Sequence, residues 1–291
     1  MFALKLSVAD SATADAVTDL LLALIEPETT AASSLEVDGQ WSVEAYYTEE
    51  PDLDLIRGGL ERCGLTEGMD GSIGDLDLVQ LAPTDWVKKS LEGLPPVRAA
   101  RFVVHGAHDR AFVRPHEIGI EIEAGLAFGT GHHGTTKGCL LALNEELKRR
   151  RPRAVLDMGT GTGVLAIAAR RAAPVRALGL DIDPVAIEVA TENARKNGVA
   201  PHVHLAVESR PESAIARDQG PYDLIFANIL APPLIKLATG LSRLVAPGGA
   251  VVLSGLLTWQ GRMVEAAWRN RGLRLERRID LDGWRTLVMR K

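Results

Sequence analysis

From Val155 to the C-terminus, short apolar runs alternate with segments whose apolar residues recur at helical spacing. The apolar runs predict a strand that begins at Val155 and further strands at residues 177–180, 202–207, 222–227 and 249–254. The helical spacing predicts helices at residues 163–172, 184–197 and 233–245. Residues 273–279 and 284–289 alternate about Asp282 and Gly283, which predicts a hairpin. This order predicts an α/β fold with a doubly wound parallel sheet.

The first 81 residues follow a different pattern. Residues 2–8 alternate between apolar and polar positions as in a strand, and residues 11–25 have helical spacing after a candidate cap, Ser11. A hairpin is expected at residues 34–37 and 41–48, a second helix at 53–63 and a closing strand at 75–81. This order fits a small α+β sandwich of the ferredoxin-like kind.

The two patterns predict two domains joined by a connector. We expect the α+β domain at residues 1–82, a linker with a short helix at 83–98 and the larger α/β domain at 99–291. Gly93 and the Pro95-Pro96 pair end the short helical segment 85–91 and indicate the linker. Two strands, at residues 100–105 and 117–123, and a helix at 139–147 are expected before the large sheet begins.

A glycine-rich turn links the first strand of the large sheet to its helix. Gly159, Gly161 and Gly163 leave no side chain at this turn, so a ligand can approach the backbone N–H groups that open the helix. Asp181 follows 20 residues after Gly161 at the tip of the next strand, where a carboxylate can accept hydrogen bonds from a ribose diol. The pattern therefore predicts a nucleoside site. Gly161, Gly163 and Ala166 also satisfy the loose dinucleotide fingerprint, a weak match by itself.

Asn228 ends another apolar strand, at the carboxyl edge where doubly wound sheets bind ligands. Its amide can donate and accept hydrogen bonds at once, and so orient either a cofactor or a target amine. A turn-forming Asn before a helix is the structural alternative.

Four stretches together carry a family resemblance: residues 125–136, 156–168, 179–187 and 227–231. The chain resembles the bacterial methyltransferases of ribosomal large-subunit protein eleven, which belong to the Rossmann-like class that uses S-adenosyl-L-methionine. The resemblance extends to the small acidic N-terminal domain and to the domain order. It implies that Thr136, Gly159, Asp181 and Asn228 contact the cofactor, and Gly161 belongs to the same loop. The family's usual proline is replaced by Gly134, which is expected to loosen the loop before Thr136.

The implied reaction is in-line transfer of the sulfonium methyl group to a lysine side-chain amine or an N-terminal amine. The amine must first lose its proton, which a desolvated pocket beside a cationic sulfonium favours. No dedicated base is required, and Asn228 is the candidate catalytic residue because it can orient the amine. Three other readings stay open: a lysine methyltransferase of another protein, such as the electron-transfer flavoprotein β subunit; an RNA methyltransferase; and a nicotinamide-dependent dehydrogenase or nucleotide-binding module.

Charge is divided unequally along the chain. Residues 1–81 hold 17 acidic and three basic residues, a formal charge of −14, whereas the remainder has a formal charge of +9. We therefore expect the N-terminal domain to bind a basic ribosomal protein, with no nucleic acid required. The two cysteines and the histidines show no metal-ligand spacing, so no metal is expected. Without a secretory or membrane-spanning segment, the expected location is the cytoplasm.

Overall fold

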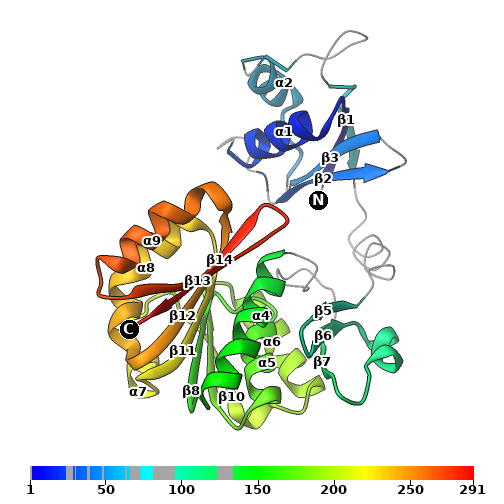
Figure 1. Cartoon of the computed structure of the whole chain (residues 1–291). Helices are drawn as coiled ribbons and strands as arrows, with labels where there is room; N and C mark the ends of the chain where they lie inside the picture. The colour runs from blue at the N-terminus through cyan, green and yellow to red at the C-terminus, as the bar shows by residue number, and fades with distance from the viewer. Residues whose placement is uncertain are drawn as a thin grey trace. The chain divides into compact units, whose positions relative to one another are not determined.

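A computed structural model of the chain describes residues 2–23, 29, 31–37, 40–47, 49–62, 64–65, 73–80, 96–122 and 134–291. The chain divides into two compact units, residues Met1–Lys89 and Ser90–Lys291 (Figure 1). Most of the expected linker and the glycine-rich stretch 125–133 lie outside the described residues. None of the helices in the described part is long and apolar enough to cross a membrane.

The described part of the N-terminal unit is a four-stranded antiparallel sheet with two helices. Its elements are β1 (Phe2–Val8), α1 (Ser11–Ala23), β2 (Ala31–Val37), β3 (Gln40–Tyr47), α2 (Leu53–Arg62) and β4 (Asp77–Gln80). The strand order is β2-β3-β1-β4, which is the ferredoxin-like order expected from the sequence. Val17 and Leu21 of α1 and Ile56 and Leu60 of α2 are buried, so both helices contribute to one core with the sheet.

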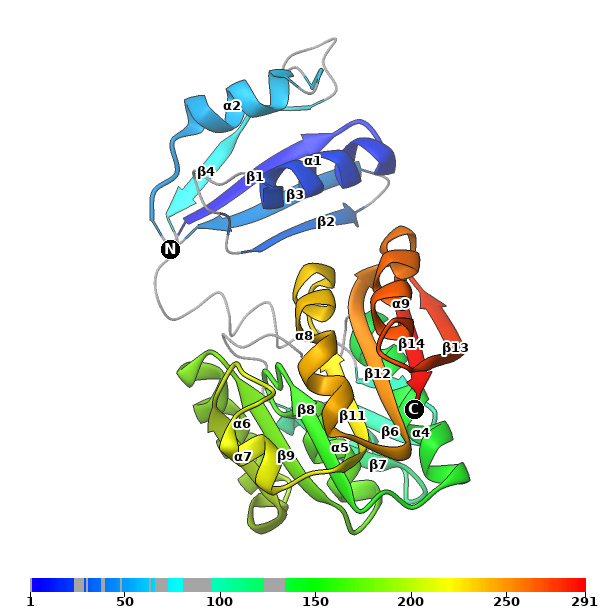
Figure 2. The ribbon, with the colours of Figure 1, turned by 90° about the vertical axis from the view of Figure 1, so that its left-hand side faces the viewer.

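The second unit contains a seven-stranded sheet. Its strands are β8 (Ala154–Met158), β9 (Arg176–Asp181), β10 (Val203–Val207), β11 (Tyr222–Asn228), β12 (Val245–Leu257), β13 (Arg274–Leu281) and β14 (Trp284–Arg290). The order is β10-β9-β8-β11-β12-β14-β13, and only β14 runs against its neighbours (Figure 2). The order reverses direction after β8, so the carboxyl ends of β8 and β11 border the crevice where such folds bind ligands.

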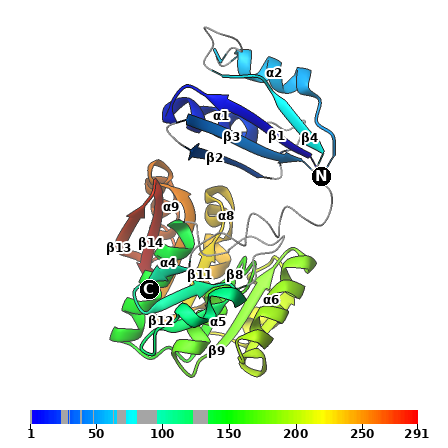
Figure 3. The ribbon, with the colours of Figure 1, turned by 90° about the vertical axis from the view of Figure 1, so that its right-hand side faces the viewer.

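Helices cover both faces of this sheet (Figures 1 and 3). One face is covered by α4 (Gly134–Arg149), α5 (Val164–Ala172) and α6 (Pro184–Lys196), and the other by α7 (Ala214–Asp218), α8 (Ala231–Leu244) and α9 (Gly261–Arg269). The central strands are buried on both faces, which explains their continuous apolar sequences. This confirms the expected doubly wound α/β fold.

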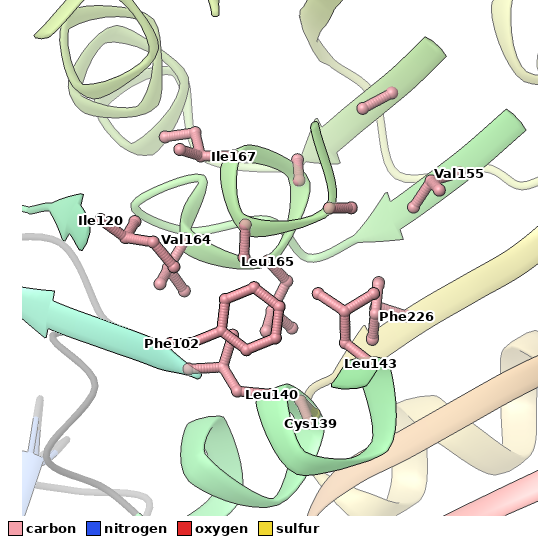
Figure 4. Close-up of a cluster of buried hydrophobic side chains, with 14 of the residues drawn as sticks. Phe102, Ile120, Cys139, Leu140, Leu143, Val155, Val164, Leu165, Ile167 and Phe226 are labelled. Atoms are coloured by element: carbon pink, nitrogen blue, oxygen red, sulfur yellow. The ribbon is translucent and has the colours of Figure 1, made fainter. Parts of the chain in front are cut away.

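A small three-stranded sheet precedes α4 and packs against the helices of the first face. It consists of β5 (Val97–Ala99), β6 (Phe102–His105) and β7 (Ile118–Glu121), with the 3-10 turn η1 (Ala107–Phe112) between β6 and β7. Phe102 and Ile120 meet Leu140 of α4 and Leu165 of α5 in one buried cluster (Figure 4). β5 begins at Val97, inside the segment expected to be the end of the linker.

Several elements differ from their expected bounds. α4 begins at Gly134 rather than at Cys139, so Thr136 lies in its first turn. β12 runs from Val245 to Leu257, well beyond the expected strand. Helices α7 and α9 and the 3-10 turns η1, η2 (Ala200–His202) and η3 (Thr258–Gln260) were not expected from the sequence. The hairpin between β13 and β14 turns at Asp282 and Gly283 as expected, and both residues have positive φ angles, of 51° and 77°.

Candidate functional site

The glycine turn after β8 is fastened to the end of β9. Gly159, Gly161 and Gly163 have φ angles of 74°, 53° and 81°, a region that side-chain-bearing residues rarely adopt. The backbone N–H groups of Gly159 and Thr160 donate to the carbonyl of Leu180, at 2.8 and 2.9 Å. Gly163 is the residue before α5, so the turn leads directly into the positive end of that helix. The turn is therefore a fixed backbone surface at the carboxyl edge.

Glycine at position 159 is required by packing as well as by conformation. A Cβ atom at this position would overlap Cγ2 of Ile229, the residue that follows Asn228. The turn after β8 and the end of β11 are thus in contact, although about 70 residues of sequence separate them. This contact brings the first glycine and the strand-end asparagine predicted from the sequence to one place.

Asp181 lies at the carboxyl end of β9 and is half-buried. Its Oδ2 accepts the Gly161 N–H at 2.8 Å, and its Oδ1 accepts the Asp183 N–H at 3.1 Å. Each carboxylate oxygen can accept a further hydrogen bond, so the group can still bind a diol. Asp181 therefore has a structural role that the sequence did not reveal, because it holds the glycine turn against β9.

Thr136 and Asn228 face each other across the start of α4 and the end of β11. The Asn228 side-chain N–H group lies 3.5 Å from Thr136 Oγ1, a long hydrogen bond that a ligand could replace. Thr136 is buried in the first turn of α4, and Asn228 is half-buried. Gly134 opens this helix, and a Cβ there would lie 2.9 Å from the Leu281 carbonyl oxygen. Gly134 thus permits a close contact with the β13–β14 hairpin, whereas the loop that it was expected to loosen lies outside the described residues.

Two hydroxyl residues that sequence reasoning missed hold the first turn of α4 in place. Ser254 of β12 is paired with Asn228 in the sheet register, and its Oγ donates to the Thr135 carbonyl at 3.2 Å. The same hydroxyl lies 2.8 Å from Thr286 Oγ1 of β14. Ser254 and Thr286 lie on β12 and β14, far from α4 in the sequence. Only the tertiary structure brings these two residues to the site.

Asp157 is a fully buried carboxylate at the base of the glycine turn. Its Oδ2 accepts hydrogen bonds from the Thr160 hydroxyl at 2.7 Å and from the Ala166 N–H at 3.1 Å, whereas Oδ1 has no partner. Burial, reinforced weakly by the charge of Asp181 and opposed by these two hydrogen bonds, raises the pKa of Asp157 to about 7. A group poised near neutrality beside a ligand-binding turn is a recognised feature of functional sites.

The described residues hold no group of three or more histidine, cysteine or acidic side chains placed to bind a metal ion. His132 and His133 lie outside those residues. Cys139 is buried in α4, and desolvation raises the pKa of its thiol, which is therefore unsuited to act as a nucleophile. Apart from the buried Asp157, the described part of the site offers backbone N–H groups, the Asp181 carboxylate and the neutral side chains of Thr136 and Asn228.

The sequence is similar to known proteins over nearly its whole length. A family model described as ribosomal protein L11 methyltransferase (PrmA) matches residues 8–291. The ribosomal protein L11 methyltransferase of Bradyrhizobium diazoefficiens is 46% identical over 286 residues, covering 98% of this chain and 96% of the relative. That of Rhodopseudomonas palustris is 46% identical over 285 residues, covering 98% and 95%.

A solved structure agrees with these relatives. The crystal structure of a ribosomal protein L11 methylase from Lactobacillus delbrueckii subsp. bulgaricus has a TM-score of 0.59 and 29% identity, and it covers 68% of this chain and 100% of its own. The resemblance seen in the sequence motifs is thereby confirmed. The chain belongs to the ribosomal protein L11 methyltransferase family.

Proposed function

We propose that this enzyme methylates lysine side-chain amines, the N-terminal amine, or both, of ribosomal protein L11. Family membership makes the protein an S-adenosylmethionine-dependent methyltransferase whose protein substrate is L11. The proposal adds the type of amine that is methylated and the residues that act on it. The observation that carries the proposal is the convergence of Thr136, Gly159, Asp181 and Asn228 at one carboxyl edge.

The residues at this edge fit an adenosine-containing cofactor. The Asp181 carboxylate has the acceptors that two ribose hydroxyls need, and the Gly159–Gly161 turn leaves backbone accessible beside it. Thr136 and Asn228 supply a hydroxyl and an amide for the polar end of the ligand. S-adenosylmethionine supplies an activated methyl group, so the side chains need only bind, orient and exclude water.

Asn228 is proposed to orient the accepting amine. Its amide oxygen can accept a hydrogen bond from a neutral amine, while its N–H group can donate to Thr136 or to the cofactor. We expect Asn228→Ala to lower kcat for L11 methylation by about tenfold to a hundredfold, the loss of one well-placed hydrogen bond. Affinity for S-adenosylmethionine, measured by calorimetry, should fall much less. Equal losses in both quantities would leave Asn228 as a cofactor contact only.

The acidic N-terminal unit is proposed to recognise the substrate. Glu49 and Glu50 are exposed before α2, within a segment of formal charge −14. A lysine- and arginine-rich ribosomal protein would be attracted to this unit, whereas RNA phosphates would be repelled. Glu49→Gln with Glu50→Gln should slow association with L11 at low salt, and high salt should abolish the difference. Glu188→Gln, at an exposed acid on α6, is the matched control.

The direct test incubates the purified enzyme with L11 and S-adenosylmethionine without RNA, followed by mass spectrometry of intact protein and of peptides. Methyl groups on lysine or the N-terminal residue are expected. Parallel incubations replace L11 with RNA or with the electron-transfer flavoprotein β subunit. Modification of either one in preference to L11 would favour the alternative functions. Since the substrate is a ribosomal protein, we also place the enzyme in the cytoplasm, which fractionation can check.

A further inference from the structure

Large apolar side chains are exposed just beyond the carboxyl ends of β11 and β12. Leu230 is 67% exposed just before α8, Trp259 is 72% exposed in η3, and Met263 is 51% exposed in the first turn of α9. Isolated exposed apolar residues are ordinary, but a tryptophan and two long aliphatic side chains at one edge are typical of a binding surface.

Backbone connections place these three side chains at the same end of the sheet. β11 and β12 are parallel neighbours, and the Ile229 N–H donates to the Ser254 carbonyl at 3.1 Å. Helices α8 and α9 begin just beyond these strands and lie side by side (Figures 2 and 3).

Two hydrogen bonds show that α8 and α9 run in the same direction. Trp268 Nε1 donates to the Leu234 carbonyl at 3.1 Å, and one turn further Arg271 Nε donates to Thr239 Oγ1 at 2.8 Å. The two pairs are 34 and 32 residues apart, and either separation places Leu230 level with the first turn of α9. Leu230, Trp259 and Met263 thus lie beyond the carboxyl ends of β11 and β12, and they are called here the apolar edge patch; Leu230 is two residues after Asn228.

The turn that carries Trp259 is rigid. The Thr258 N–H donates to the Gly283 carbonyl at 3.0 Å, and Arg285 Nη1 donates to the Thr258 carbonyl at 2.9 Å. The Gln260 side chain accepts the Leu257 N–H at 2.8 Å. An exposed indole on a fixed turn loses little conformational freedom when a partner covers it, so its apolar area is available for binding.

From this geometry we infer that the apolar edge patch binds the L11 segment that carries the accepting amine, with an apolar side chain of that segment covering Trp259. The inference rests on the proposed function, because the patch adjoins the residue proposed to orient the amine. A protein substrate must bring backbone and neighbouring side chains to this edge together with its amine. The patch offers them apolar area, and so complements the electrostatic attraction proposed for the N-terminal unit.

The test is Trp259→Ala in the full-length enzyme, assayed with purified L11. We expect KM for L11 to rise at least about tenfold, equivalent to about 1.4 kcal/mol. The value of kcat and the calorimetric affinity for S-adenosylmethionine should stay within about twofold, since Trp259 touches neither reacting group. Trp259→Phe should restore most of the lost affinity. Unlike the effect of the N-terminal acids, the increase in KM should persist at high salt, because apolar contacts are not screened.

Phe112→Ala is the matched control, because Phe112 is an aromatic residue 64% exposed on η1, in the small sheet. An unchanged KM for Trp259→Ala, or a KM that rises equally in the control, would overturn the inference. A lower thermal midpoint with unchanged KM would assign the patch to a contact within the chain, and would also overturn it. If the parent enzyme itself fails to methylate L11, the proposed function fails; if only the Trp259 effect is absent, that function stands.

Discussion

The buried carboxylate of Asp157 should make the stability of the second unit, which contains the candidate site, depend on pH. Its pKa is about 7 in the folded protein, mainly because of desolvation, compared with 3.8 for an ordinary aspartate. Below about pH 4 the carboxyl group is protonated in both states, so its burial adds no pH-dependent cost. Between about pH 4 and pH 7 the unfolded chain releases the proton while the folded protein retains it. The free energy of unfolding should therefore fall over this window by about 1.4 kcal/mol per pH unit.

The perturbation is Asp157→Asn, which removes the titration and keeps an oxygen for the Thr160 and Ala166 donors. Any free-energy cost of the new amide is independent of pH. The quantity compared is therefore the slope of the free energy of unfolding against pH. From pH 5 to pH 8 the parent should lose on the order of 3 kcal/mol relative to the variant. Urea denaturation at several pH values, followed by tryptophan fluorescence, measures this difference, and Trp268 is a fully buried reporter in the same unit.

The two stability curves would run parallel between pH 5 and pH 8 if the carboxylate were stabilised by something other than the contacts described. That result would refute the reasoning, since a group with an unpartnered buried oxygen cannot remain charged at no cost. Titrating groups of the N-terminal unit are common to both proteins and cancel in the comparison.

Two further substitutions test the candidate site and a buried ion pair in the same unit. Asp181→Ala should weaken S-adenosylmethionine binding by about tenfold to a hundredfold, because an ionic hydrogen-bond acceptor is lost and the Gly161 N–H loses its partner. An affinity equal to that of the parent, measured by calorimetry, would refute the assignment of Asp181 to the cofactor site. Glu146→Gln should lower the free energy of unfolding by about 1–3 kcal/mol, because Glu146 and Arg290 form a buried ion pair at 2.7 Å. Glu145→Gln, which breaks a more exposed pair with Lys148, should cost less than about 1 kcal/mol, and equal losses would contradict this account.

Local patterns in the sequence were sufficient to predict most of the helices and strands of both units. Strands buried on both faces appear as continuous apolar runs, and the order of strands and helices then leaves few topologies. The glycine turn and Asp181 were predictable for the same reason, since both depend on one strand, one turn and the next strand. Helix α9 was not predicted, although Val264 and Trp268 are spaced one turn apart as in an amphipathic helix, so its pattern was present in the sequence.

Tertiary structure alone decided how the site is supported. Thr136 was expected in a loop, yet its position in the first turn of α4 depends on Ser254 and Thr286, which reach it from distant strands. The apolar edge patch likewise exists only because parallel helices α8 and α9 begin at the same edge. A sequence records spacing along the chain, so it determines the local turn that is proposed to hold the cofactor. Contacts between remote segments arise from packing, and these fix which side chains surround that turn.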